Sequence, residues 1–145
     1  MNMTHLLPSA VSTVFILLAL WHFYMAAAPA SGRSGAVPTV EGKPLFTPSV
    51  KSTLAVGVVL LLFAALVAAT SGVLSVEPSP SILKWLSYGL AVGLLGRAIG
   101  EFNHVGFFKR NRGSRFATLD TFVYSPLCLL LSIGVALVAA GSGDT

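Results

Sequence analysis

The chain has 145 residues, of which 54% are hydrophobic and only 10% are charged, and its mean hydropathy is +0.83. Soluble domains carry about 25% charged residues, so this composition excludes an ordinary soluble domain and indicates a membrane protein. The net charge of +4 comes from bases that stand beside apolar runs, which is the distribution that membrane orientation produces. We therefore expect membrane lipids as partners and no nucleic acid.

Four apolar runs account for most of the chain, and Lys84 is the one charged residue inside them. A bilayer core near 30 Å needs about 20 helical residues, and each run reaches that length with its flanks. We predict an all-α fold, a four-helix transmembrane bundle that forms a single integral membrane domain over residues 1–145. The predicted helices cover residues 9–28, 51–76, 81–102 and 119–140.

The first run ends near Ala26-Ala27-Ala28, which resembles a signal-peptide cleavage region, but the first ten residues contain no Lys or Arg. A secretory signal begins with a basic region, so we interpret this run as the first membrane helix. Near its end, His22 stands among Trp21, Phe23 and Tyr24, an aromatic belt of the kind found at membrane interfaces. An interfacial contact or a satisfied helix–helix hydrogen bond is the first interpretation of His22, and a functional role is the second.

A segment rich in proline and glycine, residues 30–49, follows the first helix. Within it, two β-favouring stretches flank Glu41-Gly42, a short glycine-containing connection that favours a hairpin turn. We predict a short hairpin between the first two helices, lying at one end of the bundle as a lid or as packing.

The Lys and Arg residues predict the orientation of the chain in the membrane. They gather in the first and third connections, whereas the second connection has only Lys84; the bases of the two rich connections are Arg33, Lys43, Lys51, Lys109, Arg110, Arg112 and Arg115. Short cytoplasmic loops carry such an excess, so we expect those two connections in the cytoplasm and both termini outside. We interpret 109–115 as a solvated turn at anionic headgroups.

Four glycines form one stripe along the predicted third helix, because Gly89, Gly93, Gly96 and Gly100 are spaced at i, i+4, i+7 and i+11. Small residues at this spacing let membrane helices approach closely. We expect the stripe to pack against a helix of this chain or of a second copy.

Ionisable side chains from three predicted helices share one membrane face. Arg97 and Glu101 are i, i+4 neighbours that can pair, either as a structural ion pair or as part of a site. We predict a polar pocket at the cytoplasmic end, formed by His22, Arg97, Glu101, His104, Asp120 and Tyr124.

Several functions fit such a pocket, and the sequence does not decide among them. Glu101 and His104 have the Glu-x-x-His spacing of di-iron bundles, but a second pair is absent, so we predict no metal and no cofactor. Acid–base catalysis on a lipid-like substrate would use His22, Glu101 and Asp120, and a dimeric proton-coupled transporter is a further alternative. Our leading hypothesis is the binding of a hydrophobic or amphipathic ligand or of a membrane partner. A second copy of this chain counts as such a partner. The single cysteine, Cys128, excludes an intramolecular disulfide and is interpreted as a packing residue.

Three groups of short motifs stand out along the chain. They are Val37-Pro38-Thr39 with Gly42-Lys43-Pro44-Leu45-Phe46; Arg97-Ala98-Ile99-Gly100-Glu101-Phe102 with Val105-Gly106-Phe107-Phe108-Lys109; and Phe116-Ala117, Leu119-Asp120-Thr121 and Tyr124-Ser125-Pro126-Leu127-Cys128. The chain resembles in these motifs a family of small bacterial integral membrane proteins classified as a domain of unknown function. The resemblance covers nearly the whole chain and implies a four-span protein of the bacterial inner membrane, but no activity.

Overall fold

A computed structural model describes residues 3–28, 37–41, 43–76, 79–100, 104–110 and 113–142. Its elements are α1 (Met3–Ala27), β1 (Thr39–Val40), β2 (Lys43–Pro44), α2 (Val50–Thr70), α3 (Pro80–Ile99), α4 (Arg115–Leu119), the π-helical turn η2 (Asp120–Tyr124) and α5 (Ser125–Gly141). Within the described residues, four helical segments are long and apolar enough to cross a membrane: His5–Ala27, Val50–Thr70, Pro80–Ile99 and Arg115–Gly141. The predicted four-span all-α fold is confirmed.

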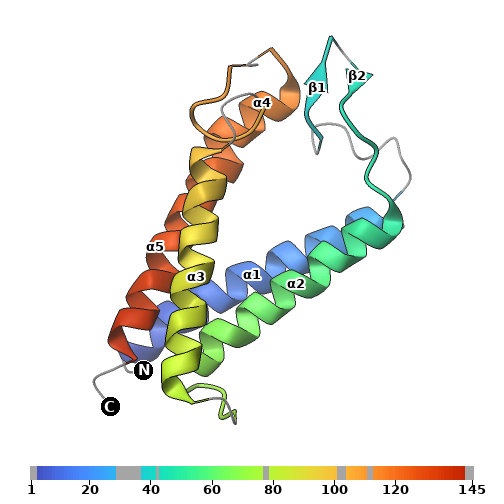
Figure 1. The fold of residues 1–145 in the computed structure, drawn as a ribbon. Coiled ribbons are helices and arrows are strands. Elements are labelled where there is room, and N and C mark those ends of the chain that lie inside the picture. Colours follow the sequence, from blue (N-terminus) through green and yellow to red (C-terminus); the bar gives the residue numbers. More distant parts are fainter. Residues whose placement is uncertain are drawn as a thin grey trace.

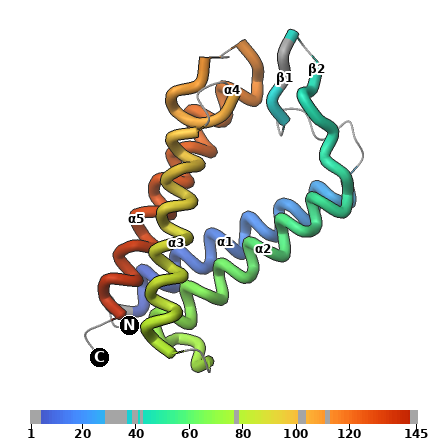
Figure 2. Tube along the Cα trace, in the orientation of Figure 1, coloured from blue at the N-terminus to red at the C-terminus, as the bar shows by residue number. Residues whose placement is uncertain are grey.

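The helices form two antiparallel pairs that meet at one end and diverge toward the other (Figure 1). α1 packs along α2, and α3 packs along α5. The start of α1 and the end of α5 lie together where the pairs meet, which we call the narrow end. We call the opposite end, with α4 and the β strands, the wide end, and the tube in Figure 2 shows the same divergence.

The hydrophobic core lies toward the narrow end. Its buried residues come from all four long helices: Val11, Phe15, Ala64, Val67, Ala91, Leu131, Val135 and Val138. The rings of Phe15 and Phe63 join α1 to α2 in an edge-on contact with centroids 5.8 Å apart. The two pairs share this core toward the narrow end. At the wide end the pairs are separate, so each pair is stabilised there by its own contacts.

Hydroxyl groups reinforce the packing between helices. Ser132 Oγ of α5 donates to the Ala91 carbonyl of α3 at 2.7 Å, and both residues are buried. Thr70 Oγ1 at the end of α2 lies 2.9 Å from Ser87 Oγ of α3. Such hydrogen bonds between membrane helices contribute about 0.6 kcal/mol on average, so they support the packing and fix the register of the pairs.

The helix boundaries differ from the predicted ones for local reasons. α1 begins at Met3, before the predicted start at residue 9, so it includes Pro8. α2 ends at Thr70 because Gly72 takes a left-handed conformation (φ 75°), and the following Leu74 N–H returns to the Ala68 carbonyl at 3.0 Å. α3 ends at Ile99, where Gly100 has φ 84°.

The predicted hairpin is present at the wide end of the α1–α2 pair (Figure 1). Thr39 pairs with Pro44 and Val40 pairs with Lys43, and Glu41 at the turn has φ 51°. The side chains of Leu45 and Phe46 are exposed, so these apolar residues do not pack on the helices as we had expected.

The contact between α1 and α2 depends on Gly57. A Cβ atom at this position would overlap the ring of Phe23 in α1, whereas one at Gly96 would meet no other atom within 4 Å. Overpacking a tight contact costs about 1–3 kcal/mol. We predict that Gly57→Leu lowers the thermal unfolding temperature of the purified protein in detergent, and that Gly96→Leu, the matched control, does not. An equal loss for both variants would contradict this packing.

Candidate functional site

The wide end of the α3–α5 pair is organised around the carboxylate of Asp120, which is fully buried. Its Oδ1 accepts a hydrogen bond from Arg97 Nη2 at 2.8 Å. Its Oδ2 accepts from Lys109 Nζ at 3.0 Å and from the Gly106 N–H at 2.6 Å. Three segments of the chain therefore converge on a single buried anion.

Lys109 is the second buried charge of this cluster. Its side chain has no exposed area, and its ammonium group also donates to the Gly106 carbonyl at 3.0 Å and to Thr121 Oγ1 at 2.6 Å. A buried charge is tolerated when it is paired and its donors find acceptors, and Lys109 meets both conditions. Our interpretation of Lys109 as part of a solvated turn is wrong, although Arg110 and Arg115 in the same stretch are exposed.

Two glycines fold the segment after α3 back onto the helix end. Gly100 (φ 84°) and Gly106 (φ 92°) both take the left-handed conformation that favours glycine. A Cβ atom on Gly100 would overlap the Val105 carbonyl, and one on Gly106 would overlap the Ile99 carbonyl. The Phe107 N–H then donates to the Ala98 carbonyl at 3.0 Å. This reversal delivers the Gly106 amide and Lys109 to Asp120.

A π-helical turn sets the direction of Asp120. In η2 the Ser125 N–H bonds to the Asp120 carbonyl, five residues back. Residues five apart lie about 140° apart around an α-helix, but a π-helical turn holds more residues and brings them closer to the same face. Asp120 and Ser125 are both fully buried, so the wider turn places both on the face that continues into the buried side of α5.

Two buried polar atoms in this region lack a hydrogen-bond partner among the described residues, namely Arg97 Nη1 and Ser125 Oγ. Arg97 reaches Asp120 through Nη2 alone, and 37% of its side-chain area is exposed, in contrast to the fully buried Asp120. Arg97 is therefore the member of the cluster that keeps both free donor capacity and access to the surroundings.

The structure brings together only some of the residues proposed for the polar pocket. Arg97 and Asp120 are in contact, and Tyr124 packs its ring on Phe116, with centroids 6.0 Å apart. His104 lies in the segment folded back from α3 and is half-buried. Glu101 lies outside the described residues, so the predicted Arg97–Glu101 pair is not tested.

His22 belongs to the other helix pair. It lies near the end of α1, where the two pairs have diverged (Figure 1), and its Nδ1–H donates to the Leu18 carbonyl of its own helix at 2.7 Å. This hydrogen bond within its own helix satisfies one ring nitrogen of His22, and it tests neither interpretation of the residue. The structure does not bring His22 to Asp120.

The glycine stripe is open. A Cβ atom on Gly89, Gly93 or Gly96 would find no other atom within 4 Å, so at these three positions no described part of the chain makes the expected close contact. The buried residues Ser87, Ala91 and Ala98 lie on the opposite side of α3, where Ala91 contacts Ser132 of α5 and Ser87 contacts Thr70 of α2. Gly100 differs from the other three, because it permits the close approach of the segment folded back from α3.

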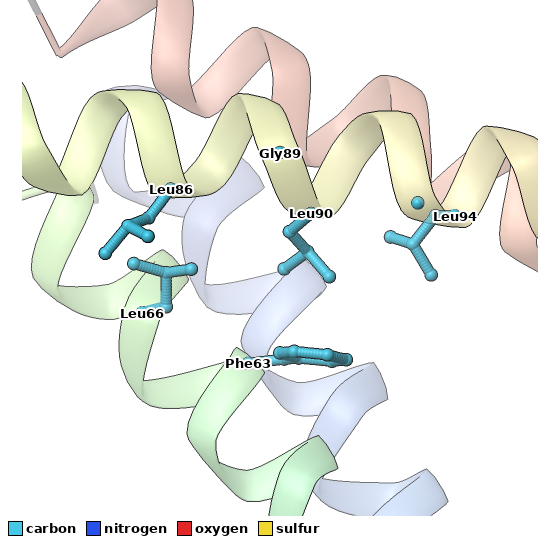
Figure 3. Close-up of a pocket in the computed structure, with 7 residues that line it drawn as sticks. Phe63, Leu66, Leu86, Gly89, Leu90 and Leu94 are labelled. Carbon is cyan, nitrogen blue, oxygen red and sulfur yellow. The ribbon is translucent and has the colours of Figure 1, made fainter.

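Beside the stripe, an open groove of about 530 Å³ runs between α2 and α3. Figure 3 shows Leu86, Leu90 and Leu94 of α3 facing Phe63 and Leu66 of α2. Gly89 and Gly93 complete the lining, which has no charged side chain. A second open cavity, of about 670 Å³ at the narrow end, mixes hydroxyl and apolar groups and has His5 as its ionisable side chain.

The described residues contain no group of three or more His, Cys, Asp or Glu side chains placed to hold a metal ion. The Glu101–His104 pair is not tested, since Glu101 lies outside those residues. Sequence reasoning missed Lys109, Gly106 and Thr121 as members of the cluster. The available signal was the combination of Lys109 after a glycine-containing turn with Asp120-Thr121 at the start of the last span.

Four apolar helices of spanning length, with ionisable groups buried at one end, define a multi-pass integral membrane protein. The chain belongs to the family described as "Protein of unknown function (DUF3995)", which matches residues 15–135. No curated protein matches the chain, and no solved structure matches it.

We predict that Lys109→Met destabilises the protein strongly, because it leaves the buried Asp120 carboxylate without its fully buried cation. Breaking a buried ion pair costs about 3–5 kcal/mol. Thermal unfolding in detergent measures the effect, and Arg110→Met is the matched control because Arg110 is exposed. Equal stability of the two variants would show that Lys109 does not support this end of the α3–α5 pair.

Proposed function

We propose that this protein binds a hydrophobic or amphipathic small molecule from the membrane in the groove between α2 and α3. The observation that carries the proposal is the groove itself, an apolar space of about 530 Å³ flanked by two helices of spanning length. Small-molecule sites have volumes of about 300–1,000 Å³ and mainly apolar linings. The apolar walls of the groove would contact the alkyl chain of the bound molecule. That molecule would enter from the surrounding lipid through the open side of the groove.

The arrangement of α3 supports this proposal. Ala91 contacts α5 through the hydrogen bond from Ser132 Oγ to its carbonyl, and it lies on the side of α3 opposite the glycines, so the glycine-bearing face is not needed for that pairing. Side chains at Gly89 and Gly93 would project into open space at the edge of the groove. Their absence keeps this space clear for a ligand.

The cluster at Asp120 weighs against the acid–base alternative. Both carboxylate oxygens accept hydrogen bonds from protein donors, two of them cationic. A general base must be within hydrogen-bond reach of the proton it removes, and His22, the proposed partner, lies on the other helix pair. These contacts favour a binding and structural role for the wide end over proton transfer.

The proposal includes a location, the bacterial inner membrane with the wide end in the cytoplasm. Exposed bases from both helix pairs stand at this end: Lys43, Lys51, Arg110 and Arg115. The narrow end has Lys84 as its base in the described chain. An excess of bases on short loops marks the cytoplasmic side, and both ends of the chain would then lie outside.

We predict that a leucine side chain in the groove displaces the bound molecule. A Cβ atom at Gly93 or Gly89 would meet no atom of another part of the described chain within 4 Å, so Gly93→Leu and Gly89→Leu should retain folding, and replacing a mid-helix glycine favours the helix by up to about 1 kcal/mol. Native mass spectrometry of the protein purified in mild detergent should find a molecule retained by the wild type and lost from both variants.

Val92→Leu is the matched control, because Val92 lies on α3 outside the groove with 69% of its area exposed. It should retain the molecule as the wild type does. If wild type and Gly93→Leu carry the same molecules, or if the wild type is a dimer that Gly93→Leu converts to a monomer, the groove binds no small molecule of this kind.

We also predict how the two ends are accessible from outside the cell. In a Cys128→Ser background, a cysteine at Ser75, at the narrow end, should react with a membrane-impermeant maleimide in intact cells. A cysteine at Thr47, at the wide end, should react only after permeabilisation; both positions are exposed in the structure. The reverse pattern would overturn the proposed orientation.

A further inference from the structure

We propose that the ligand of the groove is an anionic phospholipid, with one acyl chain between α2 and α3 and its phosphate bound by Arg97. The inference rests on the proposed function, since it names the ligand of the same groove. In this inference the wide end of the protein recognises the charge of the headgroup, and the groove holds the acyl chain attached to that headgroup.

The position of Arg97 relative to the groove is the first support. Leu90, Leu94 and Arg97 are spaced at i, i+4 and i+7, so they share one face of α3. Leu90 and Leu94 line the groove. Arg97 lies about 4.5 Å beyond Leu94 along the helix axis, at about 1.5 Å per residue. This part of α3 lies where the two helix pairs have diverged (Figure 1). A chain in the groove would therefore bring its headgroup to Arg97.

The hydrogen bonds of Arg97 are the second support. A guanidinium has five N–H donors in a planar fork that matches phosphate and carboxylate oxygens, and here Asp120 receives one through Nη2. Nη1 is covered and has no acceptor among the described residues, which is unfavourable for a donor removed from water. A phosphate oxygen would supply that acceptor after a small movement of the groups that cover Nη1.

The presence of two cations at Asp120 is the third support. Lys109 is fully buried and bonds to Asp120 Oδ2, whereas Arg97 bonds to Oδ1 and is 37% exposed. If Arg97 turns toward a ligand, Lys109 and the Gly106 N–H still compensate the carboxylate. The cluster therefore assigns different tasks to its cations, with Lys109 holding the fold and Arg97 available to an anion.

The surroundings favour a lipid phosphate. The groove opens along two membrane-spanning helices, and Lys51, Arg110 and Arg115 are exposed at the same end of the molecule. Basic sites between membrane helices on the cytoplasmic side bind anionic lipid headgroups. An anion that also carries an alkyl chain would use both the groove and Arg97, whereas a free anion would use Arg97 alone.

The test is a competition between two lipids that differ in headgroup charge. The full chain, delipidated in detergent, is mixed with equal amounts of phosphatidylglycerol and phosphatidylcholine with identical acyl chains, and bound lipid is counted by native mass spectrometry. We expect the wild type to prefer phosphatidylglycerol by about tenfold, the scale of one charged hydrogen bond. Arg97→Gln should bind both lipids about equally, and Arg97→Lys should keep part of the preference.

The controls separate the inference from the proposed function. Val92→Leu should behave as the wild type, and Gly93→Leu should lose both lipids. If Gly93→Leu loses both lipids but the wild type shows no preference, or Arg97→Gln keeps the preference, the inference is overturned and the groove function stands. If Gly93→Leu retains both lipids, the proposed function fails. Displacement of phosphatidylglycerol by an equal concentration of inorganic phosphate would indicate a free anion at Arg97 and overturn the lipid assignment.

Discussion

The wide end of the α3–α5 pair depends on one buried carboxylate. Asp120 is reached by Arg97 from α3, by Lys109 and by the Gly106 amide, all within 3.0 Å. A buried carboxylate without such partners would be strongly destabilising, so the three segments must stay together. The unusual local geometry serves this requirement: the glycine reversal brings Gly106 and Lys109 to the anion, and the π-helical turn points the anion inward.

This constraint explains how the molecule can be open at one end. The shared hydrophobic core joins the four long helices near the narrow end, and beyond it each pair relies on its own contacts. The ionic cluster fixes the end of the α3–α5 pair without help from α1 or α2, and Gly57 against Phe23 closes the other pair. The groove between α2 and α3 (Figure 3) adjoins the shared core, because Phe63, Leu90 and Leu94 line the groove and also pack against the core.

Composition and the length of the apolar runs were sufficient to predict four spans, because the bilayer imposes both. The hairpin was also predictable, since Glu41-Gly42 between two β-favouring stretches indicates a turn. Lys109 was not, because a lysine beside Arg110 looks solvated in a sequence and only the fold-back at Gly100 and Gly106 buries it. Arg97 contacts Asp120, 23 residues away, a partner that helical spacing cannot indicate; the spacing indicates Glu101, which lies outside the described residues.

The open glycines of α3 support the proposal that a molecule outside the chain occupies the groove. A glycine within a helix costs about 0.5–1 kcal/mol relative to alanine, and at Gly57 and Gly134 a close contact offsets that cost. Gly57 admits a ring of α1, Gly134 lies against Val11, and Gly100 and Gly106 permit the chain reversal. Gly89, Gly93 and Gly96 have no such neighbour in the described chain, although they lie in one row beside an apolar groove. Alanine at these positions would favour the helix and clash with no described residue. Contacts within the described chain therefore do not account for the row, whereas the proposed ligand would account for it, because its groove needs a flat edge.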